Sequence, residues 1–139
     1  TNPMAVNDPS EIPSISLDVH KDGNLIETIM LENRAVFKIR GQSPESQNTG
    51  EPGVVSLLHE SISECHAVFV VDKTDGVVLI DLASQHGTFV NGKKLEANFP
   101  TKVAQKGDIV TFGASTRQYH VKIDYNRMLA AQERALKQL

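Results

Sequence analysis

The chain contains very little cysteine and no long apolar run. Cys65 is the only cysteine among 139 residues. One thiol cannot form an internal disulfide or build a cysteine-rich zinc site, and it is compatible with a reducing compartment. Apolar runs such as residues 67–71 and 77–80 are far shorter than the roughly 20 residues that a membrane-spanning helix needs. We therefore expect an intracellular protein that makes no use of a membrane.

The sequence also lacks an excess of positive charge. Its formal net charge is −3, so no basic field draws the chain toward DNA, RNA or an anionic lipid surface. Hydrophobic residues make up 40% and charged residues 22%, which is ordinary for a folded domain. A chain of this length is expected to form one domain, as a monomer that does not bind nucleic acid directly.

The motifs of common enzymes are missing as well. Five histidines are scattered through expected strands and turns, without an HExxH or paired-cysteine spacing that would hold a metal. There is no GxSxG, GxxxxGK[ST] or GxGxxG motif. We expect no catalytic residues, no metal and no cofactor.

What the sequence does contain is a series of short apolar stretches divided by Gly, Asn, Asp and Ser turns, which predicts strands. The expected strands are residues 15–20, 25–31, 35–39, 54–58, 66–71, 77–82, 108–113 and 118–124, with a tight hairpin at 88–97. About ten or eleven such strands favour an all-β fold, a two-sheet β-sandwich.

The ends of the chain depart from this pattern. Residues 1–14 are polar, without the apolar stretch of a signal peptide, and are expected to form a flexible leader. Residues 15–124 form the expected domain, in which residues 41–53 make a long loop insert. Residues 125–139 favour a short helix. Because so short a helix is marginal alone, it should pack on its own sandwich or bind a partner.

Two segments concentrate polar side chains in expected turns. Ser63 stands three residues before His66, and residues 83–88 read ASQHGT after a buried strand. An Asn91-Gly92 turn follows, and residues 112–119 read FGASTRQY. Loops of this kind on a rigid sandwich can hold an anion or an extended peptide.

Together these motifs resemble the forkhead-associated (FHA) family, over residues 15–124. Residues 17–27, 79–90 and 112–119, with histidine at position 86, are most similar to the members linked to protein phosphatase-1 regulation and splicing. The resemblance implies a β-sandwich that binds a threonine-phosphorylated protein or peptide. It also implies an adaptor for phosphorylated nuclear or splicing-related partners, located in the nucleus.

The resemblance also implies roles for individual residues. The expected phosphopeptide-binding residues are Arg40, Ser63, Glu64, Ser84, Gln85 and His86. Those expected to support the site are Gly41, His66, Gly87, Thr88 and Asn91. Arginine and serine would hold the phosphate, because a dianion with three acceptor oxygens needs convergent donors. A carboxylate at position 64 would instead repel it.

One departure bears on the phosphate ligand. The family's Gly-Arg pair falls on Arg40-Gly41, in reversed order. Since adjacent strand residues point to opposite faces, the exchange turns Arg40 away from the pocket unless a bulge or strand end restores it. Two functions therefore stay open: a phosphothreonine-binding module, or a degenerate FHA domain that binds proteins without phosphate, through a sheet face, the insert or the terminal helix.

Overall fold

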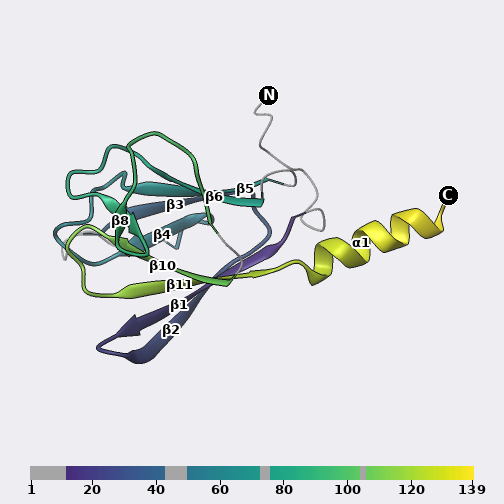
Figure 1. Cartoon of the computed structure of the whole chain (residues 1–139), viewed down its shortest axis with the longest axis horizontal. Helices are drawn as coiled ribbons and strands as arrows, with labels where there is room; N and C mark the ends of the chain where they lie inside the picture. Colours follow the sequence, from purple (N-terminus) through teal and green to yellow (C-terminus); the bar gives the residue numbers. More distant parts are fainter. Residues whose placement is uncertain (1–11, 43–49, 73–75, 104–105) are drawn as a thin grey trace.

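The computed structural model describes residues 12–42, 50–72, 76–103 and 106–139. Most of the expected leader and the middle of the expected loop insert, residues 43–49, lie outside the described residues. Within the described ranges the chain forms two sheets that face each other, followed by one helix (Figure 1). The fold is therefore the β-sandwich that the sequence predicts, with a C-terminal helix.

The larger sheet has six strands in the order β2-β1-β11-β10-β7-β8. All its strand pairs are antiparallel. Their bounds are β1 Ser14–Lys21, β2 Asn24–Leu31, β7 Thr88–Val90, β8 Lys93–Lys94, β10 Lys106–Phe112 and β11 Gln118–Asp124. The first and the last strand of the chain thus lie side by side in this sheet.

The smaller sheet has five strands in the order β4-β3-β5-β6-β9. Its β3–β4 pair is parallel and the others are antiparallel. Their bounds are β3 Val36–Gly41, β4 Val54–Leu57, β5 Ala67–Asp72, β6 Gly76–Asp81 and β9 Thr101–Lys102. Because a parallel pair needs a crossover, the long connection at residues 42–53 brings β4 to the outer edge of this sheet.

The core lies between the sheets and follows from the alternation of each strand. In β1 the side chains of Ile15, Leu17 and Val19 are buried, and in the neighbouring β11 those of Tyr119 and Val121 are. The residues between them face outward, as a period of two requires. Burial of one apolar face per sheet stabilises the sandwich and holds the loops at its ends.

Two tight hairpins use residues that tolerate positive φ. Asp22 and Gly23 have φ of 52° and 81°, and Asn91 and Gly92 have φ of 53° and 83°. This pairing suits the two-residue turns whose twist matches antiparallel strands. The second turn is fixed further: Asn91 Oδ1 accepts from the Ile109 amide at 2.9 Å, and its amide nitrogen donates to Asp108 at 3.0 Å.

Two features differ from the sequence-based expectation. Strand β9 was not predicted, because it has only two residues and its run follows Pro100. Helix α1, Asn126–Lys137, has no buried residue and projects from the sandwich (Figure 1). Arg127 donates to Asn33 at 2.8 Å, but Leu129 and Leu136 stay exposed. The expectation that the helix packs on its own sandwich is therefore not met.

Candidate functional site

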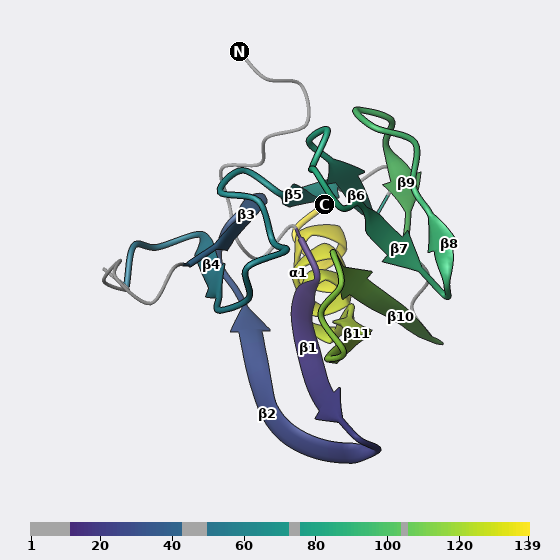
Figure 2. The same ribbon diagram turned by 90° about the vertical axis from the view of Figure 1, so that its left-hand side faces the viewer.

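The candidate site lies at one end of the sandwich, where loops join the two sheets. Its parts are the end of β3, the β4–β5 loop at residues 58–66 and the β6–β7 loop at residues 82–87. Figure 2 views the molecule from the side on which these loops lie. We call these segments the rim.

His66 ties the two rim loops together. Its Nδ1 accepts from the Ser63 amide at 3.0 Å, so Nε2 carries the proton and donates to the Gly87 carbonyl at 2.8 Å. The ring is fully buried and meets Phe112 edge-on, with centroids 5.6 Å apart. Burial, which disfavours the charged imidazole, lowers the pKa of His66 below its ordinary value. The ring therefore positions backbone on both loops.

Asp81, at the end of β6, holds the β6–β7 loop in place by hydrogen bonds. Its carboxylate accepts from the Ser84 hydroxyl at 2.5 Å, the Ser84 amide at 3.2 Å and the Thr88 hydroxyl at 2.7 Å. The Ser84 hydroxyl in turn accepts from the Gly87 amide at 3.0 Å. Asp81 and Thr88 are both buried. The Ser84 hydroxyl is thus already hydrogen-bonded within the loop, whereas the side chains of the next two residues, Gln85 and His86, are exposed.

Ser63 stands where the two loops meet. Its hydroxyl oxygen accepts from the Gln85 amide at 3.0 Å, and its hydroxyl proton remains to be donated. The side chains of Gln85 and His86 are exposed, and so is that of Glu64. The rim therefore presents a fixed hydroxyl beside two exposed polar side chains and one carboxylate.

Arg40 lies on β3, on the face opposite to the core. Phe37 and Ile39 are buried, whereas Lys38 and Arg40 alternate with them and are partly exposed. The Arg40 Nε atom is buried and has no hydrogen-bond partner within the described part of the chain. In these ranges no hydrogen bond joins Arg40 to Ser63. Among the described residues, the Nε–H group of Arg40 is thus an unused donor, and it makes no hydrogen bond with Ser63 in this structure.

Gly41 shows why the arginine cannot stand one position later. The Gly41 amide donates to the Ser63 carbonyl at 2.8 Å, which brings the two backbones together. A Cβ atom on residue 41 would overlap the Ile62 carbonyl oxygen. The register of β3 with β4 also runs without a shift from Lys38 through Gly41, so no bulge reorients Arg40. Position 41 accepts no side chain in this backbone.

The structure adds a support that the sequence did not single out. The Ser61 hydroxyl donates to His59 Nδ1 at 2.7 Å and accepts from the Ala114 amide at 2.8 Å. A Cβ atom on Gly113 would come within 2.5 Å of the Ser61 hydroxyl oxygen. These contacts anchor the β4–β5 loop to the β10–β11 turn. Serine and glycine are common in any turn, so their spacing gave no signal.

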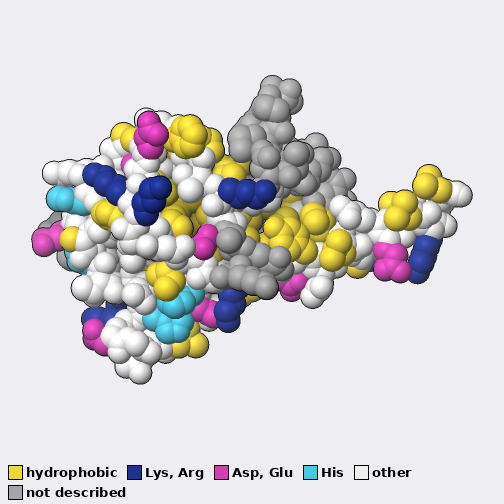
Figure 3. Space-filling model, in the orientation of Figure 1, with side chains coloured by type: hydrophobic (Ala, Val, Ile, Leu, Met, Phe, Trp, Pro, Cys, Tyr) yellow, Lys and Arg dark blue, Asp and Glu magenta, His cyan; other side chains and the backbone are white. Residues whose placement is uncertain are grey.

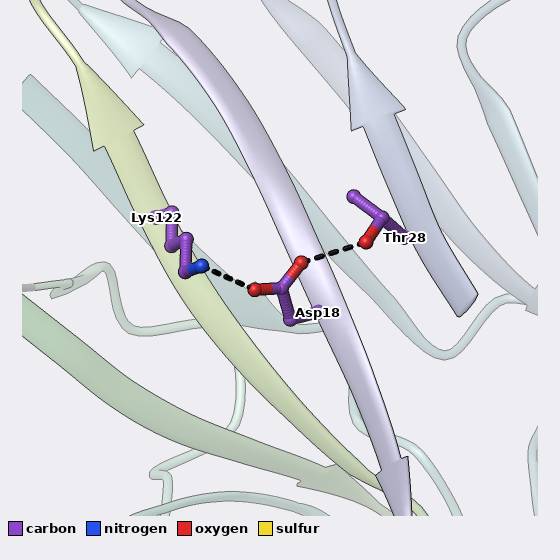
Figure 4. A network of polar contacts seen from close by, with 3 residues as sticks. All are labelled: Asp18, Thr28 and Lys122. Atoms are coloured by element: carbon purple, nitrogen blue, oxygen red, sulfur yellow. Dashed lines mark hydrogen bonds and ion pairs between the residues drawn. The ribbon is translucent and has the colours of Figure 1, made fainter. Parts of the chain in front are cut away.

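A second polar cluster lies on the outer face of the larger sheet, away from the rim. The Asp18 carboxylate accepts from the Thr28 hydroxyl at 2.8 Å and pairs with Lys122 at 2.5 Å (Figure 4). The rings of His20 and His120 meet nearby with centroids 4.1 Å apart. Figure 3 shows histidine side chains gathered over β1 and β11, flanked by groups of both charges. This outer face carries mixed charge and no fixed loop.

A metal cluster and a membrane-spanning helix each place a structural requirement on the described ranges of the chain. No group of three or more His, Cys, Asp or Glu side chains there is placed to hold a metal ion. Among the same residues, no helix has the length and apolar character needed to span a bilayer.

Comparisons with known proteins bear on the rim. Residues 50–113 match the family model described as the FHA domain. The PPP1R8 homolog of Arabidopsis thaliana, a protein phosphatase 1 regulatory inhibitor subunit, is 36% identical over 105 residues, covering 75% of this chain and 26% of that protein. The human nuclear inhibitor of protein phosphatase 1 is 34% identical over 111 residues, covering 79% and 29%. The chain thus spans less than a third of the length of these relatives.

Solved structures share the fold. The yeast splicing factor Pml1 matches with a TM-score of 0.67 at 15% identity, covering 80% of each chain. The FHA domain of TbPar42 matches with a TM-score of 0.56 at 30% identity, covering 78% of this chain and 56% of that one. Sequence and fold therefore agree: this chain contains an FHA domain, a non-catalytic interaction domain, and its curated relatives include nuclear inhibitors of protein phosphatase 1.

Proposed function

We propose that this FHA domain binds a threonine-phosphorylated segment of a partner protein at the rim. The observation that carries the proposal is the fixed Ser63 hydroxyl, held by the Gln85 amide and by the His66 contact to the Ser63 amide. A donor fixed before binding loses little freedom when the ligand arrives, so it adds affinity at small entropic cost.

Arg40 is the cation that would complete this site. Among the residues that the structure describes, its buried Nε atom has no hydrogen-bond partner, and a buried donor left unpaired is unfavourable. A phosphate oxygen would satisfy it through a charge-assisted hydrogen bond. Because Arg40 and Ser63 are not bonded to each other, the phosphate would bridge the two, with a change in the arginine side chain alone.

Gln85 and His86 would hold the peptide rather than the phosphate. Their side chains are exposed on a loop whose backbone is fixed by Asp81 and His66. Amide and imidazole groups can bond the main chain of an extended peptide on either side of the phosphothreonine. Recognition would then combine a charged anchor with neutral backbone contacts.

The partner would come from the nucleus and from splicing or phosphatase-1 regulation. The support is the names of the relatives, which include a nuclear inhibitor of protein phosphatase 1 and a splicing factor. The chain covers only part of those relatives, so phosphatase regulation would depend on segments beyond this domain.

The test is the affinity of the protein for a phosphothreonine peptide library and for its unphosphorylated twin, by fluorescence anisotropy. We expect phosphate-dependent binding in the micromolar range. Both Arg40→Ala and Ser63→Ala should weaken it about tenfold or more, since each removes a bond to a charged group. The matched control is Lys38→Ala, which removes a cation two residues away on the same face of β3.

A second function is favoured by one observation, the closed position at Gly41. If Arg40 does not reach the phosphate, the domain would bind proteins without phosphate recognition. Equal affinity for the two forms of the peptide would establish this second function and reject the first. Binding that depends on phosphate but is unchanged in Arg40→Ala would show that another cation holds the phosphate.

A further inference from the structure

A second hollow, which the proposed phosphothreonine site does not use, opens beside the rim. It holds about 140 Å³ of space. Its walls come from the β1–β2 hairpin, the β4–β5 loop and the β10–β11 turn. Ile62 lines it, and Ser63 is the next residue along the chain. The hollow and the Ser63 hydroxyl therefore lie on either side of one short loop.

Every polar side chain that lines this hollow can donate a hydrogen bond. They are Lys21, His59, Ser115, Thr116, Arg117 and Tyr119. Two of these side chains, Lys21 and Arg117, are basic. No carboxylate is among the described residues that line the hollow. A cavity that is lined by two cations and several hydroxyls, without an acidic group among its described lining, is suited to an oxyanion.

His59 is oriented so that its free donor is available. Its Nδ1 accepts from both the Ser61 amide, at 3.1 Å, and the Ser61 hydroxyl, at 2.7 Å. The proton therefore stands on Nε2, which donates to no group in the described part of the chain. Ser61 is in turn fixed by the Ala114 amide, so the histidine and the β10–β11 turn are held together.

Arg117 is held in a similar way from the opposite wall. Its guanidinium lies beside the Tyr119 hydroxyl, whose ring is buried in the core. Its amide lies 3.4 Å from the Ser115 hydroxyl, which shapes the turn. Glu27, whose charge acts on the same hydroxyl, lies on β2 opposite Val19 and lines a different hollow. The Arg117 guanidinium has five N–H donors, so its contact with Tyr119 leaves donors for an external anion.

We propose that this hollow is a second anion site, which binds an oxyanion of the segment that occupies the rim. The oxyanion is a second phosphoryl group or an acidic side chain, since both offer oxygens to the same donors. The link to one bound segment rests on the proposed function, whereas anion binding in the hollow does not. A partner with two anionic groups would then be preferred over one with the phosphothreonine alone.

The first experiment tests the hollow without any peptide. Inorganic phosphate is titrated into the ¹⁵N-labelled protein, and amide shifts are followed by NMR. We expect saturable shifts at Ser115, Thr116 and Arg117 that are lost in Arg117→Gln and reduced in Lys21→Gln. The control Lys102→Gln removes an exposed cation on β9, outside the hollow. Shifts confined to Ser63 and Gln85 would overturn the second site and leave the rim proposal standing.

The second experiment distinguishes the sources of the anion. Affinities are measured for a phosphothreonine peptide and for versions with an added phosphoserine or glutamate at varied spacing. We expect one added anion to strengthen binding about tenfold, the gain from one bond to a charged group. Arg117→Gln should remove this gain and leave the singly phosphorylated peptide unaffected.

The two possible failures look different. If Arg117→Gln weakens all peptides equally, or if no added anion strengthens binding, the bipartite site is rejected. If instead Ser63→Ala leaves every affinity unchanged while the NMR shifts persist in the hollow, the rim proposal fails and the anion site remains.

Discussion

Two carboxylates on opposite parts of this small domain show how location changes what the same group does. Asp81 is only 3% exposed and accepts three hydrogen bonds from the β6–β7 loop. Asp18 lies on the outer face of the larger sheet and accepts from Thr28 and Lys122. The first determines the conformation of a loop that has no regular structure. The second links strands that backbone hydrogen bonds already hold.

The two carboxylates differ in what happens to their hydrogen-bond donors when the carboxylate is removed. The Thr88 hydroxyl beside Asp81 is buried, so it would remain unpaired without the carboxylate, and Ser84 would lose two hydrogen bonds that hold its loop. The Lys122 side chain is 66% exposed and would return to water. The Asp18 side chain itself is 11% exposed, but its ionic partner is open to water, so solvent screening and side-chain entropy offset part of the Coulomb energy of the pair. The rim should therefore be sensitive to single substitutions and the outer face tolerant of them.

The largest expected effect comes from Asp81→Ala. It removes the acceptor of three hydrogen bonds, two of them from hydroxyls, and should lower the free energy of unfolding by about 3 kcal/mol. Urea denaturation measures the loss. The matched control is Asp18→Ala on the outer face, for which we expect less than about 1 kcal/mol. Equal losses in the two variants would contradict the comparison.

A smaller loss is expected from Gly41→Ala. The added Cβ would overlap the Ile62 carbonyl, so the β4–β5 loop must shift, at about 2 kcal/mol. The shift would also move Ser63, whose carbonyl accepts from the Gly41 amide. Phosphopeptide affinity should therefore fall along with stability.

Gly23→Ala provides the control, because Gly23 also lies in a turn and has open space around its Cβ position. That variant should keep full affinity, although its positive φ makes it modestly less stable. Normal peptide binding by Gly41→Ala would show that the close approach at the rim is not needed.

Acid should destabilise the folded chain through His66. Burial lowers the folded-state pKa of His66, so the unfolded chain takes up a proton more readily than the folded chain. Stability should be full above the ordinary value of 6.5 and fall as the pH drops below it. Urea denaturation at pH 7.5 and at pH 5.5 measures the difference.

The matched variant is His66→Phe, which keeps a ring in the core and cannot take up a proton. Its stability should be lower at pH 7.5 and should change less between the two pH values. Some slope should remain, because burial also lowers the pKa of His120 on the outer face. An undiminished slope in His66→Phe would assign the acid sensitivity to other groups.

Part of the rim could be predicted from sequence, because its motifs resemble those of the FHA family. The contacts of Ser63 with His66 and of Asp81 with Ser84 span three residues, whereas the contact of His66 with Gly87 spans 21 and was expected only from the resemblance. The sandwich followed from strand alternation and turn residues, down to the Asn91-Gly92 hairpin. In these segments the local preferences of the residues favour the same structure as the global fold, and such agreement allows a structure to be predicted from sequence.

The features that the sequence did not predict depend on contacts between segments that are distant along the chain. Whether position 41 could carry the arginine depends on how closely the Gly41 backbone approaches Ile62, and the sequence gives no signal of that approach. The hollow at His59 and Arg117 joins segments more than 50 residues apart. Helix α1 was recognised from its composition, but its separation from the sandwich depends on what surfaces the rest of the fold offers.

The smallest effect is expected from Asp18→Asn, which tests the tolerant side of the comparison. Hydrogen bonds from Lys122 and Thr28 lower the pKa of Asp18, so the folded chain holds its carboxylate charged more readily than the unfolded chain does. The resulting stability is present above the ordinary value of 3.8 and is lost as the pH falls below it. At pH 7 the variant should lose about 0.5 kcal/mol, and less in high salt, since Lys122 is exposed.

Urea denaturation at low and high salt provides the measurement, with Thr28→Val as the control that removes the neutral partner and leaves the ion pair. A loss that does not depend on salt would mean that the carboxylate acts through its hydrogen bond to Thr28, and the outer face would then share the fixed character of the rim.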